Sequence, residues 1–462
     1  MSLQVPPPHS LPPRSEATRR PAPGGPAGAD AGQGPWYIAN KVSAPGKRRS
    51  SLSAESRVER RERYSRRSQS SRWLISEAIA ATLPEDVEEV EQGVFLNQRT
   101  GEIFDPGWVR PPRPARCSWR VGFQVSVHGS PEGGTRSHFS GVERCGSVWS
   151  CPVCASVIRP ERAREISKAV EGHQAAGGSV VFVTLTLRHQ KSDPLVLTLD
   201  TALQGWKKLM SHRRWSGVHG MKNRYDVEDY IRATEVTYGA NGWHPHLHVL
   251  LLTGRDLADG EVRSLGDEMH SLWSSYAYQR TGRTPSREHG IDVQRVDTEG
   301  RVLAQYLGKI QDDHKAKWTV SAELARADVK IGHGDSITPF QLLDDDTGLP
   351  PAQRLRLWTE YVAGTKGRRC ITWSRGLKDR YDVAERDDQE IIDDVEAAPP
   401  VWVTDASSWD TARRSKGSHA LVDVLDAAER GKWSRVAEIL PGFLAPPGWK
   451  PAHQRGHDPD TE

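Results

Sequence analysis

The sequence predicts an α+β protein built around a ferredoxin-like domain, in which a split βαβ arrangement places an antiparallel sheet at the centre. Two observations predict this class. Runs of β-branched residues alternate with runs of helical periodicity, and their order along the chain is β-α-β-β-α-β. The dipeptide Asn241-Gly242 separates two of the strands and is typical of a tight hairpin, which joins antiparallel neighbours.

Each element in this order has its own signal. The segment SVVFVTLTL is too rich in β-branched residues for a helix, and the two middle strands flank the hairpin dipeptide. The full prediction is strand 179–187, helix 195–212, strand 229–238, strand 244–252, helix 259–281, strand 291–296 and helix 299–311. We expect the strand 244–252 to be central and the helix 299–311 to pack across the sheet. A helix over 155–176 precedes this order, and helices over 338–343 and 352–363 and a last strand over 371–373 follow it.

Composition divides the chain into five parts. Residues 1–73 are rich in Pro, Gly and Ala and then in Ser and Arg, which predicts a disordered arm. We expect a linker with one short helix over 74–116, a cysteine-rich zinc module over 117–158 and the central domain over 159–380. Residues 381–462 are acidic to mixed, and we expect a tail with one helix over 421–440.

The charge is uneven along the 462 residues. The formal net charge is +3, but residues 1–73 alone contain 14 Lys/Arg and 5 Asp/Glu. A basic arm of this kind often follows a phosphate backbone, although a solvated tail has the same composition. No apolar run reaches the roughly 18 residues of a membrane span, and no apolar segment of a secretory signal follows the N-terminal charges. We therefore expect a cytoplasmic protein without membrane contact.

Four of the five cysteines lie close together in the sequence. They are Cys117, Cys145, Cys151 and Cys154, and the last two form a CxxC pair. Four thiolates around one ion make a closed tetrahedral site for structural Zn²⁺. A redox-active CxxC is the alternative, but it leaves two cysteines unexplained. Cys117 is the most distant ligand, and His128 or His138 could replace it, whereas Cys370 is expected in a core.

Three histidines recur at every second residue of the strand 244–252. A period of two places the imidazoles of His244, His246 and His248 on one face, and Leu247 and Val249 on the other. Glu235 lies on the partner strand, close enough in register to reach the same face. Imidazole is the commonest ligand for divalent metals, so these residues are candidate metal ligands. Ordinary structural histidines are the alternative.

Two further groups carry charge or a nucleophile. Tyr306 and Lys309 are three residues apart and share one face of the helix 299–311, a pair that is unremarkable on its own. The helix 195–212 has a basic end, and its residues are candidates for phosphate contacts or a solvated helix end: Lys207, Lys208, Arg213 and Arg214.

Several of these motifs together resemble a known family. HLHVLLL at 246–252 resembles the His-hydrophobic-His motif of HUH endonucleases, FVTLTL at 182–187 the strand that precedes it, and QYLGKI at 305–310 the Tyr-x-x-Lys motif that follows it. With CGSVWSCPVC upstream, residues 117–380 resemble the rolling-circle replication initiator (Rep) proteins of Gram-positive and actinobacterial plasmids.

The resemblance implies a site and a reaction. His246 and His248 would bind Mg²⁺ or Mn²⁺, with Glu235 as a third ligand or a partner of a histidine, while it gives His244 no firm role. Tyr306 would attack a phosphate of single-stranded or hairpin origin DNA and form a 5′-phosphotyrosine, leaving a 3′-OH primer, and Lys309 would lower the pKa of the phenol or hold the phosphate. The implied partners are plasmid origin DNA and a host helicase and polymerase.

One departure and three alternatives stay open. Some relatives carry a glutamate one helical turn before the tyrosine, where this chain has Val302 and Leu303, so the termination chemistry is not predicted. A single-strand transposase or a relaxase of the HUH superfamily is the nearest alternative, although relaxases usually carry the tyrosine ahead of the histidines. A non-catalytic zinc-dependent DNA-binding regulator is the alternative from another class, and it would form no covalent adduct.

Overall fold

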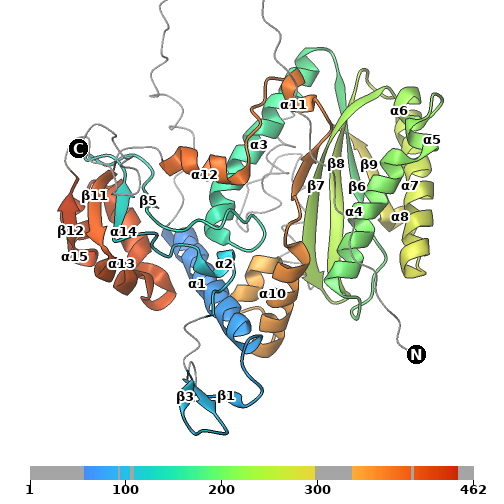
Figure 1. Cartoon of the computed structure of the whole chain (residues 1–462). Coiled ribbons are helices and arrows are strands. Elements are labelled where there is room, and N and C mark those ends of the chain that lie inside the picture. The colour runs from blue at the N-terminus through green and yellow to red at the C-terminus, as the bar shows by residue number, and fades with distance from the viewer. Residues whose placement is uncertain (1–56, 92–93, 105–108, 297–335, 397–399, 446–462) are drawn as a thin grey trace, which may run out of the picture. The chain divides into compact units, whose positions relative to one another are not determined.

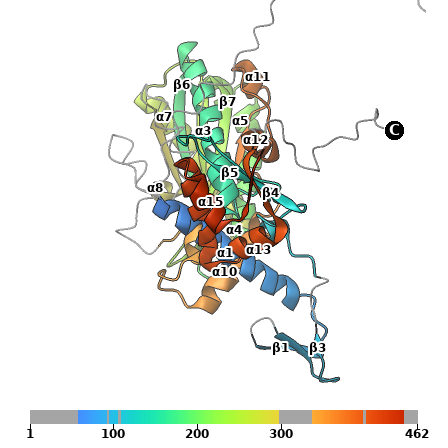
Figure 2. The ribbon, with the colours of Figure 1, turned by 90° about the vertical axis from the view of Figure 1, so that its left-hand side faces the viewer.

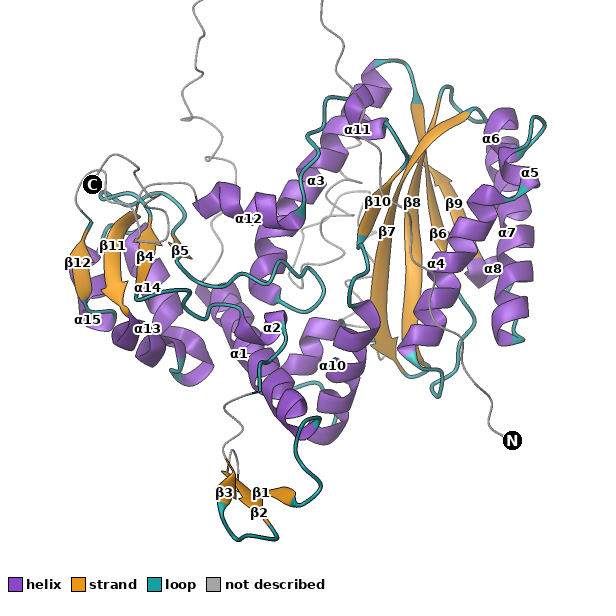
Figure 3. Cartoon of the chain, in the orientation of Figure 1, coloured by secondary structure: helices purple, strands orange, loops and turns teal. Residues whose placement is uncertain are grey.

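The structure, a computed structural model, describes residues 57–91, 94–104, 109–296, 336–396 and 400–445 (Figure 1). Within these residues the strands form three antiparallel sheets, of three, five and four strands (Figure 3). This mixture of helices with antiparallel sheets agrees with the predicted α+β class. None of the helices in the described part of the chain is long and apolar enough to span a membrane.

The five-stranded sheet contains the strands predicted for the central domain. Its order is β10-β7-β8-β6-β9, and every neighbouring pair is antiparallel. The bounds are β6 (Ser179–Leu185), β7 (Val227–Gly239), β8 (Gly242–Thr253), β9 (Ile291–Arg295) and β10 (Ile371–Trp373). Gly239 pairs with Gly242 across the predicted hairpin, and the φ of +86° at Gly242 lies in the region that favours glycine. β10 extends the sheet by an edge strand.

Helices cover one face of this sheet. They are α4 (Leu195–Ser211), α5 (Arg213–Ser216), α6 (Met221–Arg224), α7 (Asp259–Thr281) and α8 (Arg287–Gly290). Trp206 of α4 and Trp273 of α7 are buried against Leu247 and Val249 of β8. Each buried side chain of this size contributes about 1.5–3 kcal/mol of hydrophobic stabilisation. The predicted direction of Leu247 and Val249 is therefore confirmed.

The opposite face carries the even-numbered residues of β8. Leu250 and Leu252 pack there with Phe182 of β6 and with Ile166 and Val170 of the helix α3. This helix spans Pro152–Ala175, and Figures 1 and 3 show it on the side of the sheet away from α4 and α7. Because side chains alternate along a strand, His244, His246 and His248 belong to this same face. The predicted helix 299–311 lies outside the described residues.

The expectation of disorder up to residue 73 is wrong for residues 57–73. They form most of α1 (Arg57–Ala80), in which Tyr64, Arg67 and Leu74 are buried. The arginines that suggested a solvated arm instead pair with acidic residues far along the chain, as in the contacts of Arg60 with Asp426 and Arg66 with Asp344. Their charge is neutralised on folding, which composition does not reveal.

The predicted linker and tail are also more ordered than expected. In place of a linker, α1 is followed by a small sheet of β1 (Val87–Glu91), β2 (Val94–Asn97) and β3 (Ile103–Phe104), then α2 (Arg113–Arg116). The prediction of a tail with a single helix over residues 381–462 is wrong. This region contains α12 (Asp388–Glu396), β11 (Pro400–Asp405), α13 (Ala406–Arg413), η5 (Lys416–Ser418), α14 (His419–Glu429), α15 (Trp433–Ile439) and β12 (Gly442–Leu444).

A four-stranded sheet connects this C-terminal region to the predicted zinc module. β4 (Gln124–His128) and β5 (His138–Ser140) form the order β12-β11-β4-β5, and β11 pairs directly with β4. α13 and α14 lie against β4, and α13 and β4 can be followed in Figure 2 and α14 in Figure 3. Residues 117–158 are thus not a separate module. The predicted helix 421–440 is broken at Gly431, whose φ is +66° and whose backbone is in close contact with Glu132 and Gly133.

Among the described residues, two elements lie between β9 and β10. They are the 3-10 helix η4 (Pro339–Leu343) and the helix α10 (Pro351–Thr365), which match the predicted helices 338–343 and 352–363. α10 packs against α4 and α1. Its Trp358 and Tyr361 are buried, and Tyr361 contacts the indole rings of Trp149 and Trp243.

Candidate functional site

The register of the hairpin brings a carboxylate and two imidazoles together. Glu235 of β7 pairs directly with His246 of β8, and the next position on the same face of β8 is His248. The Glu235 carboxylate lies between the two rings, with its Oε2 2.6 Å from Nε2 of His246 and 3.0 Å from Nε2 of His248. All three side chains are buried, with 4% or less exposed for Glu235 and 8% or less for each histidine. These residues, called the histidine group below, match three of the four predicted metal ligands.

The spacing of the histidine group fits a divalent cation. Two ligands at right angles and about 2.1 Å from a Mg²⁺ ion are about 3.0 Å apart. The three ligand atoms lie within 4.8 Å of one another, and the two nitrogen–oxygen distances of 2.6 Å and 3.0 Å are close to that separation. Imidazole nitrogen and carboxylate oxygen are ligands that Mn²⁺ and Mg²⁺ accept in proteins. A cation held here would replace the hydrogen bonds between the three residues.

Hydrogen bonds at the other ring nitrogens fix the orientation of both imidazoles. Nδ1 of His246 lies 3.3 Å from the carbonyl oxygen of His244, and Nδ1 of His248 lies 3.2 Å from the Thr184 hydroxyl. The Phe182 ring stacks on His248 with an interplanar angle of 8°. Partners of this kind set the tautomer that leaves Nε2 for a metal. Thr184 and Phe182 belong to the FVTLTL segment, but the sequence did not show that they contact His248.

The two histidines of the group differ in their pKa. Burial disfavours the charged form of His246, but the charge of Glu235 and its hydrogen bond outweigh burial, so the pKa of His246 is raised. Burial is the larger effect at His248, and the pKa of that imidazole is lowered. A proton on His246 and a bound cation would compete for the same nitrogen beside Glu235.

His244 is not part of the histidine group. It pairs instead with His189, whose Nε2 lies 2.7 Å from Nδ1 of His244 and whose Nδ1 lies 2.9 Å from the carbonyl oxygen of Asn241. The carbonyl can only accept, so the neutral His189 donates from Nδ1 and its Nε2 accepts from His244. This leaves Nε2 of His244 as an acceptor. His189 was missed because only the tertiary fold brings the loop after β6 against the hairpin.

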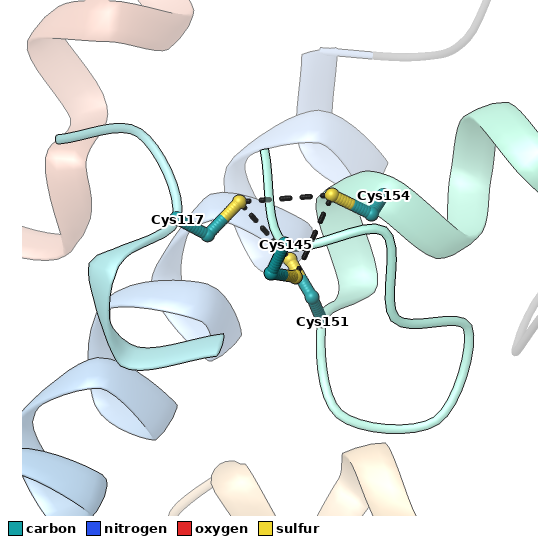
Figure 4. A group of neighbouring side chains, drawn as sticks. All are labelled: Cys117, Cys145, Cys151 and Cys154. Carbon is teal, nitrogen blue, oxygen red and sulfur yellow. Dashed lines mark hydrogen bonds between the residues drawn. The ribbon is translucent and has the colours of Figure 1, made fainter. Parts of the chain in front are cut away.

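The four clustered cysteines converge on one point, as Figure 4 shows. The sulfur of Cys117 lies 3.7 Å from that of Cys154 and 3.5 Å from that of Cys151, and the sulfurs of Cys145 and Cys154 are 3.7 Å apart. These separations are too long for disulfides, and the cysteines are free. Four sulfurs at about 2.3 Å from one Zn²⁺ ion form a tetrahedron with edges of about 3.8 Å. The observed spacing fits that geometry.

Cys117 is the fourth member of this cysteine cluster, in preference to the two histidines considered from the sequence. His128 and His138 stack on each other elsewhere, with ring centroids 4.5 Å apart. The carbonyl of Cys117 accepts a hydrogen bond from Arg67 of α1 at 3.0 Å. The part of α1 for which the sequence predicted disorder therefore helps to position Cys117 in the cluster.

Burial and thiol contacts shift the titration of the cysteines. The pKa of Cys117 lies well below its ordinary value because thiols of the other three cysteines, Cys145 first, hydrogen-bond to its sulfur. The pKa values of Cys145 and Cys151 are raised, first by their contacts with Cys117. A cation at the centre of the four sulfurs would stabilise the deprotonated form of these thiols.

The remaining predicted residues lie apart from the histidine group or outside the described chain. Tyr306 and Lys309 lie outside the described residues. The exposed side chains of the basic end of α4 and α5 are on the helix-covered face: Lys207, Lys208, Arg213 and Arg214. α5 contacts α6, which adjoins the start of β7, opposite the end of β8 at Thr253. Seven residues of strand, about 23 Å, separate Thr253 from His246.

The described residues form two clusters with metal-ligand geometry. One consists of four thiols, and the other consists of two imidazoles and a carboxylate on an antiparallel sheet. Comparison with known proteins then gives the family of this chain. A family model described as a replication protein matches residues 139–410, which include the histidine group and three of the four clustered cysteines. The chain belongs to this family of replication proteins, as the motifs predicted.

Individual relatives carry related names. The chain is 34% identical over 312 residues to "Protein rep" of Streptomyces lividans, a match that covers 54% of this chain and 67% of that protein. It is 25% identical over 200 residues to "Protein rep" of Bacillus amyloliquefaciens, covering 42% of this chain and 54% of the relative. No solved structure matches the chain significantly.

Proposed function

We propose that the chain initiates rolling-circle replication of a plasmid by nicking and rejoining one strand of the origin DNA, as an HUH endonuclease. The observation that carries the proposal is the histidine group, which lies on two adjacent strands inside the region that matches the family of replication proteins. The connectivity of β6, α4, β7, β8, α7 and β9, with the sheet order β7-β8-β6-β9, supports a ferredoxin-like core.

The histidine group would bind the metal of the reaction. His246 and His248 would supply nitrogen ligands and Glu235 an oxygen ligand, and Mg²⁺ or Mn²⁺ held there would polarise the scissile phosphate as a Lewis acid. The surrounding contacts of Thr184 and Phe182 would keep the rings oriented before DNA arrives. His244, outside this group, would present its Nε2 as a hydrogen-bond acceptor at the rim of the site.

The covalent step requires a nucleophile, and Tyr306 is our candidate. Its phenol oxygen would form a bond to phosphorus while the bond from phosphorus to the 3′ oxygen breaks, and the phenol proton would end on that 3′ oxygen. The products are a 5′-phosphotyrosine and a 3′-OH primer, so the phosphodiester energy is kept for rejoining. A free phenol has a pKa of about 10, and Lys309 would lower it or hold the phosphate.

Tyr361, whose phenol is influenced by the charge of Glu235, is a poor nucleophile. Tyr361 is buried, and burial first, with a smaller contribution from Glu235, raises the pKa of its phenol far above the ordinary value. Three indole rings surround it, those of Trp149, Trp243 and Trp358. Tyr361 therefore provides a control in tests of the nucleophile.

The cysteine cluster would hold a structural Zn²⁺ ion. All four ligands would come from the protein, which leaves no open position for chemistry. α3 begins at this cluster and reaches the sheet face that carries the histidine group. A host helicase would then unwind the plasmid, and a host polymerase would extend the 3′-OH primer.

The proposal is tested with labelled single-stranded oligonucleotides that tile the plasmid origin, incubated with the protein and Mn²⁺ and resolved on a denaturing gel. We expect a protein–DNA adduct that Tyr306→Phe abolishes, that His246→Ala weakens strongly and that Tyr361→Phe preserves. Specific binding without any adduct would instead identify a DNA-binding regulator. An undiminished adduct in Tyr306→Phe would show that another residue is the nucleophile.

A further inference from the structure

We propose that two short loops at the histidine end of the central sheet clamp the phosphates of single-stranded DNA on both sides of the histidine group. The first, the β6 loop, comprises residues 188–191, and the second, the β10 loop, comprises residues 366–369. The inference rests on the proposed function and adds the DNA path to it. In this proposal the two loops, and not the basic end of α4, guide the single DNA strand to the histidine group.

The β6 loop is held against the start of the histidine strand. The ring of His189 bonds to Asn241 and His244, as described above. A Cβ on Gly242 would lie only 2.8 Å from Cα of Lys191, so the loop backbone and the hairpin are in close contact. Arg188 and Lys191 themselves are exposed. Two cations are therefore held at one border of the site.

The β10 loop is fixed next to Glu235. The carbonyl of Cys370, which follows the loop, accepts a hydrogen bond of 2.8 Å from the backbone of Thr234. Gly367 has a φ of +73°, which allows the tight turn between α10 and β10. Lys366 and Arg369 are exposed on this turn.

Arg368, between these exposed residues, anchors the β10 loop. Its guanidinium donates to the carbonyl of Gly364 at 2.6 Å and pairs with Asp200 of α4 at 2.7 Å. Its carbonyl accepts from the indole of Trp149 at 2.8 Å, in the segment between Cys145 and Cys151. The loop backbone is thus braced from α4 and from the cysteine cluster, so only the side chains of Lys366 and Arg369 would have to order on binding.

The four exposed cations have no acidic partner within the described chain. Many surface arginines here are paired, such as Arg224 with Glu268 and Arg255 with Glu261. Arg188, Lys191, Lys366 and Arg369 form no ion pair with any described residue. Unpaired cations that remain solvated can exchange counterions for DNA phosphates, which is the main source of affinity for a single strand.

The sheet order places the histidine group between the two loops. The β6 loop follows β6 and the β10 loop precedes β10, and the intervening strands β8 and β7 carry His246, His248 and Glu235. Three strand spacings of about 4.8 Å separate β6 from β10 by about 14 Å. A DNA strand that crosses the end of the sheet would therefore contact one loop, pass the histidine group and reach the other.

The test measures the binding of a fluorescein-labelled single-stranded oligonucleotide to the full chain by fluorescence anisotropy. The affinity is measured at salt concentrations from about 50 to about 200 mM, without added divalent metal. We compare Arg188→Ala/Lys191→Ala and Lys366→Ala/Arg369→Ala with Lys222→Ala/Arg263→Ala. This control removes two exposed cations of α6 and α7. Each single-strand phosphate contact contributes about 0.7 to the salt slope, so each clamp variant should lower the slope by about 1.4.

Over that fourfold rise in salt, each clamp variant should lose about sevenfold less affinity than the unmodified chain. Combining both clamp variants should double the change in slope, and the control should leave it unaltered. Equal slopes for the clamp variants and the control would overturn the inference. This binding does not require the tyrosine, so the two proposals can fail separately. Equal salt slopes together with a Tyr306-dependent adduct would refute the clamp and leave the nicking activity in place. A reduced salt slope in the clamp variants, without any adduct, would support the clamp and refute the nicking activity.

Discussion

The contact between α1 and α14 gives the sharpest prediction about stability. Arg60 is 4% exposed and donates to Asp426 at 2.7 Å and to Glu429 at 2.8 Å, and the Asp426 side chain is 8% exposed. Arg60→Ala leaves a buried carboxylate without its main partner. Removing one member of a buried ion pair costs about 3–5 kcal/mol. We expect a loss of that size in the free energy of unfolding, measured by urea denaturation with tryptophan fluorescence.

A neighbouring arginine provides the matched control. Arg57 contacts the same Asp426 at 3.0 Å but is 46% exposed. Solvent screens such a pair, so Arg57→Ala should cost less than about 1 kcal/mol. The double variant Arg60→Ala/Asp426→Ala should recover part of the loss, because no buried charge is stranded. Similar losses in Arg60→Ala and Arg57→Ala would refute the reasoning.

The sign of the pH dependence follows from Asp426. Burial raises its pKa, against the opposing effect of Arg60, so the ionised form is less favourable in the folded chain than in the unfolded one. Removing Arg60 raises this pKa further. The loss in free energy of unfolding caused by Arg60→Ala should therefore be largest at pH values above the pKa of Asp426 in the folded variant. It should shrink as the pH falls through that pKa. A deficit that grows on acidification in this range would contradict the assignment.

Further predictions concern the two candidate metal sites and the core. The purified chain should contain one Zn²⁺ ion by elemental analysis; Cys154→Ser should lose it and Cys370→Ser, at a buried cysteine outside the cluster, should keep it. Calorimetry with Mn²⁺ should show binding that His246→Ala weakens at least tenfold and that His289→Ala, at an exposed histidine, leaves unchanged. Since the pKa of His246 is raised, Mn²⁺ should release protons and bind more tightly as the pH rises through that pKa. Leu247→Ala should cost about 2–5 kcal/mol in a urea titration because Leu247 is fully buried beneath α4 and α7.

Much of the central sheet could be predicted from local patterns. Alternation fixes which side of a strand each residue faces, so His246 and His248 share a face and Leu247 opposes them without any knowledge of the rest of the fold. The Asn241-Gly242 signal sets the hairpin, and the hairpin sets the register that pairs Glu235 with His246. The helices over 195–211 and 259–281 followed from their apolar periodicity.

Contacts between distant segments could not be predicted in this way. The arginine-rich first part of α1 has no apolar stripe that would predict a helix. The partners of its arginines, Asp423, Asp426 and Glu429, are more than 360 residues away in the chain. His189 joins His244 only because the loop after β6 returns to the hairpin. Cys117 joins the cysteine cluster through contacts between distant segments, such as the hydrogen bonds from Arg67 to its carbonyl and from the backbone of Ser118 to Glu143.

The sequence by itself determined the local chemistry of this protein: the imidazoles on one face of a strand, the close pair Cys151 and Cys154, and the antiparallel hairpin. These depend on backbone periodicity and short loops, which neighbouring residues encode. The tertiary structure decided which charges are neutralised and which cations are left at the rim of the site. That outcome depends on burial and on charge pairing across hundreds of residues, and these exist only once the chain has packed.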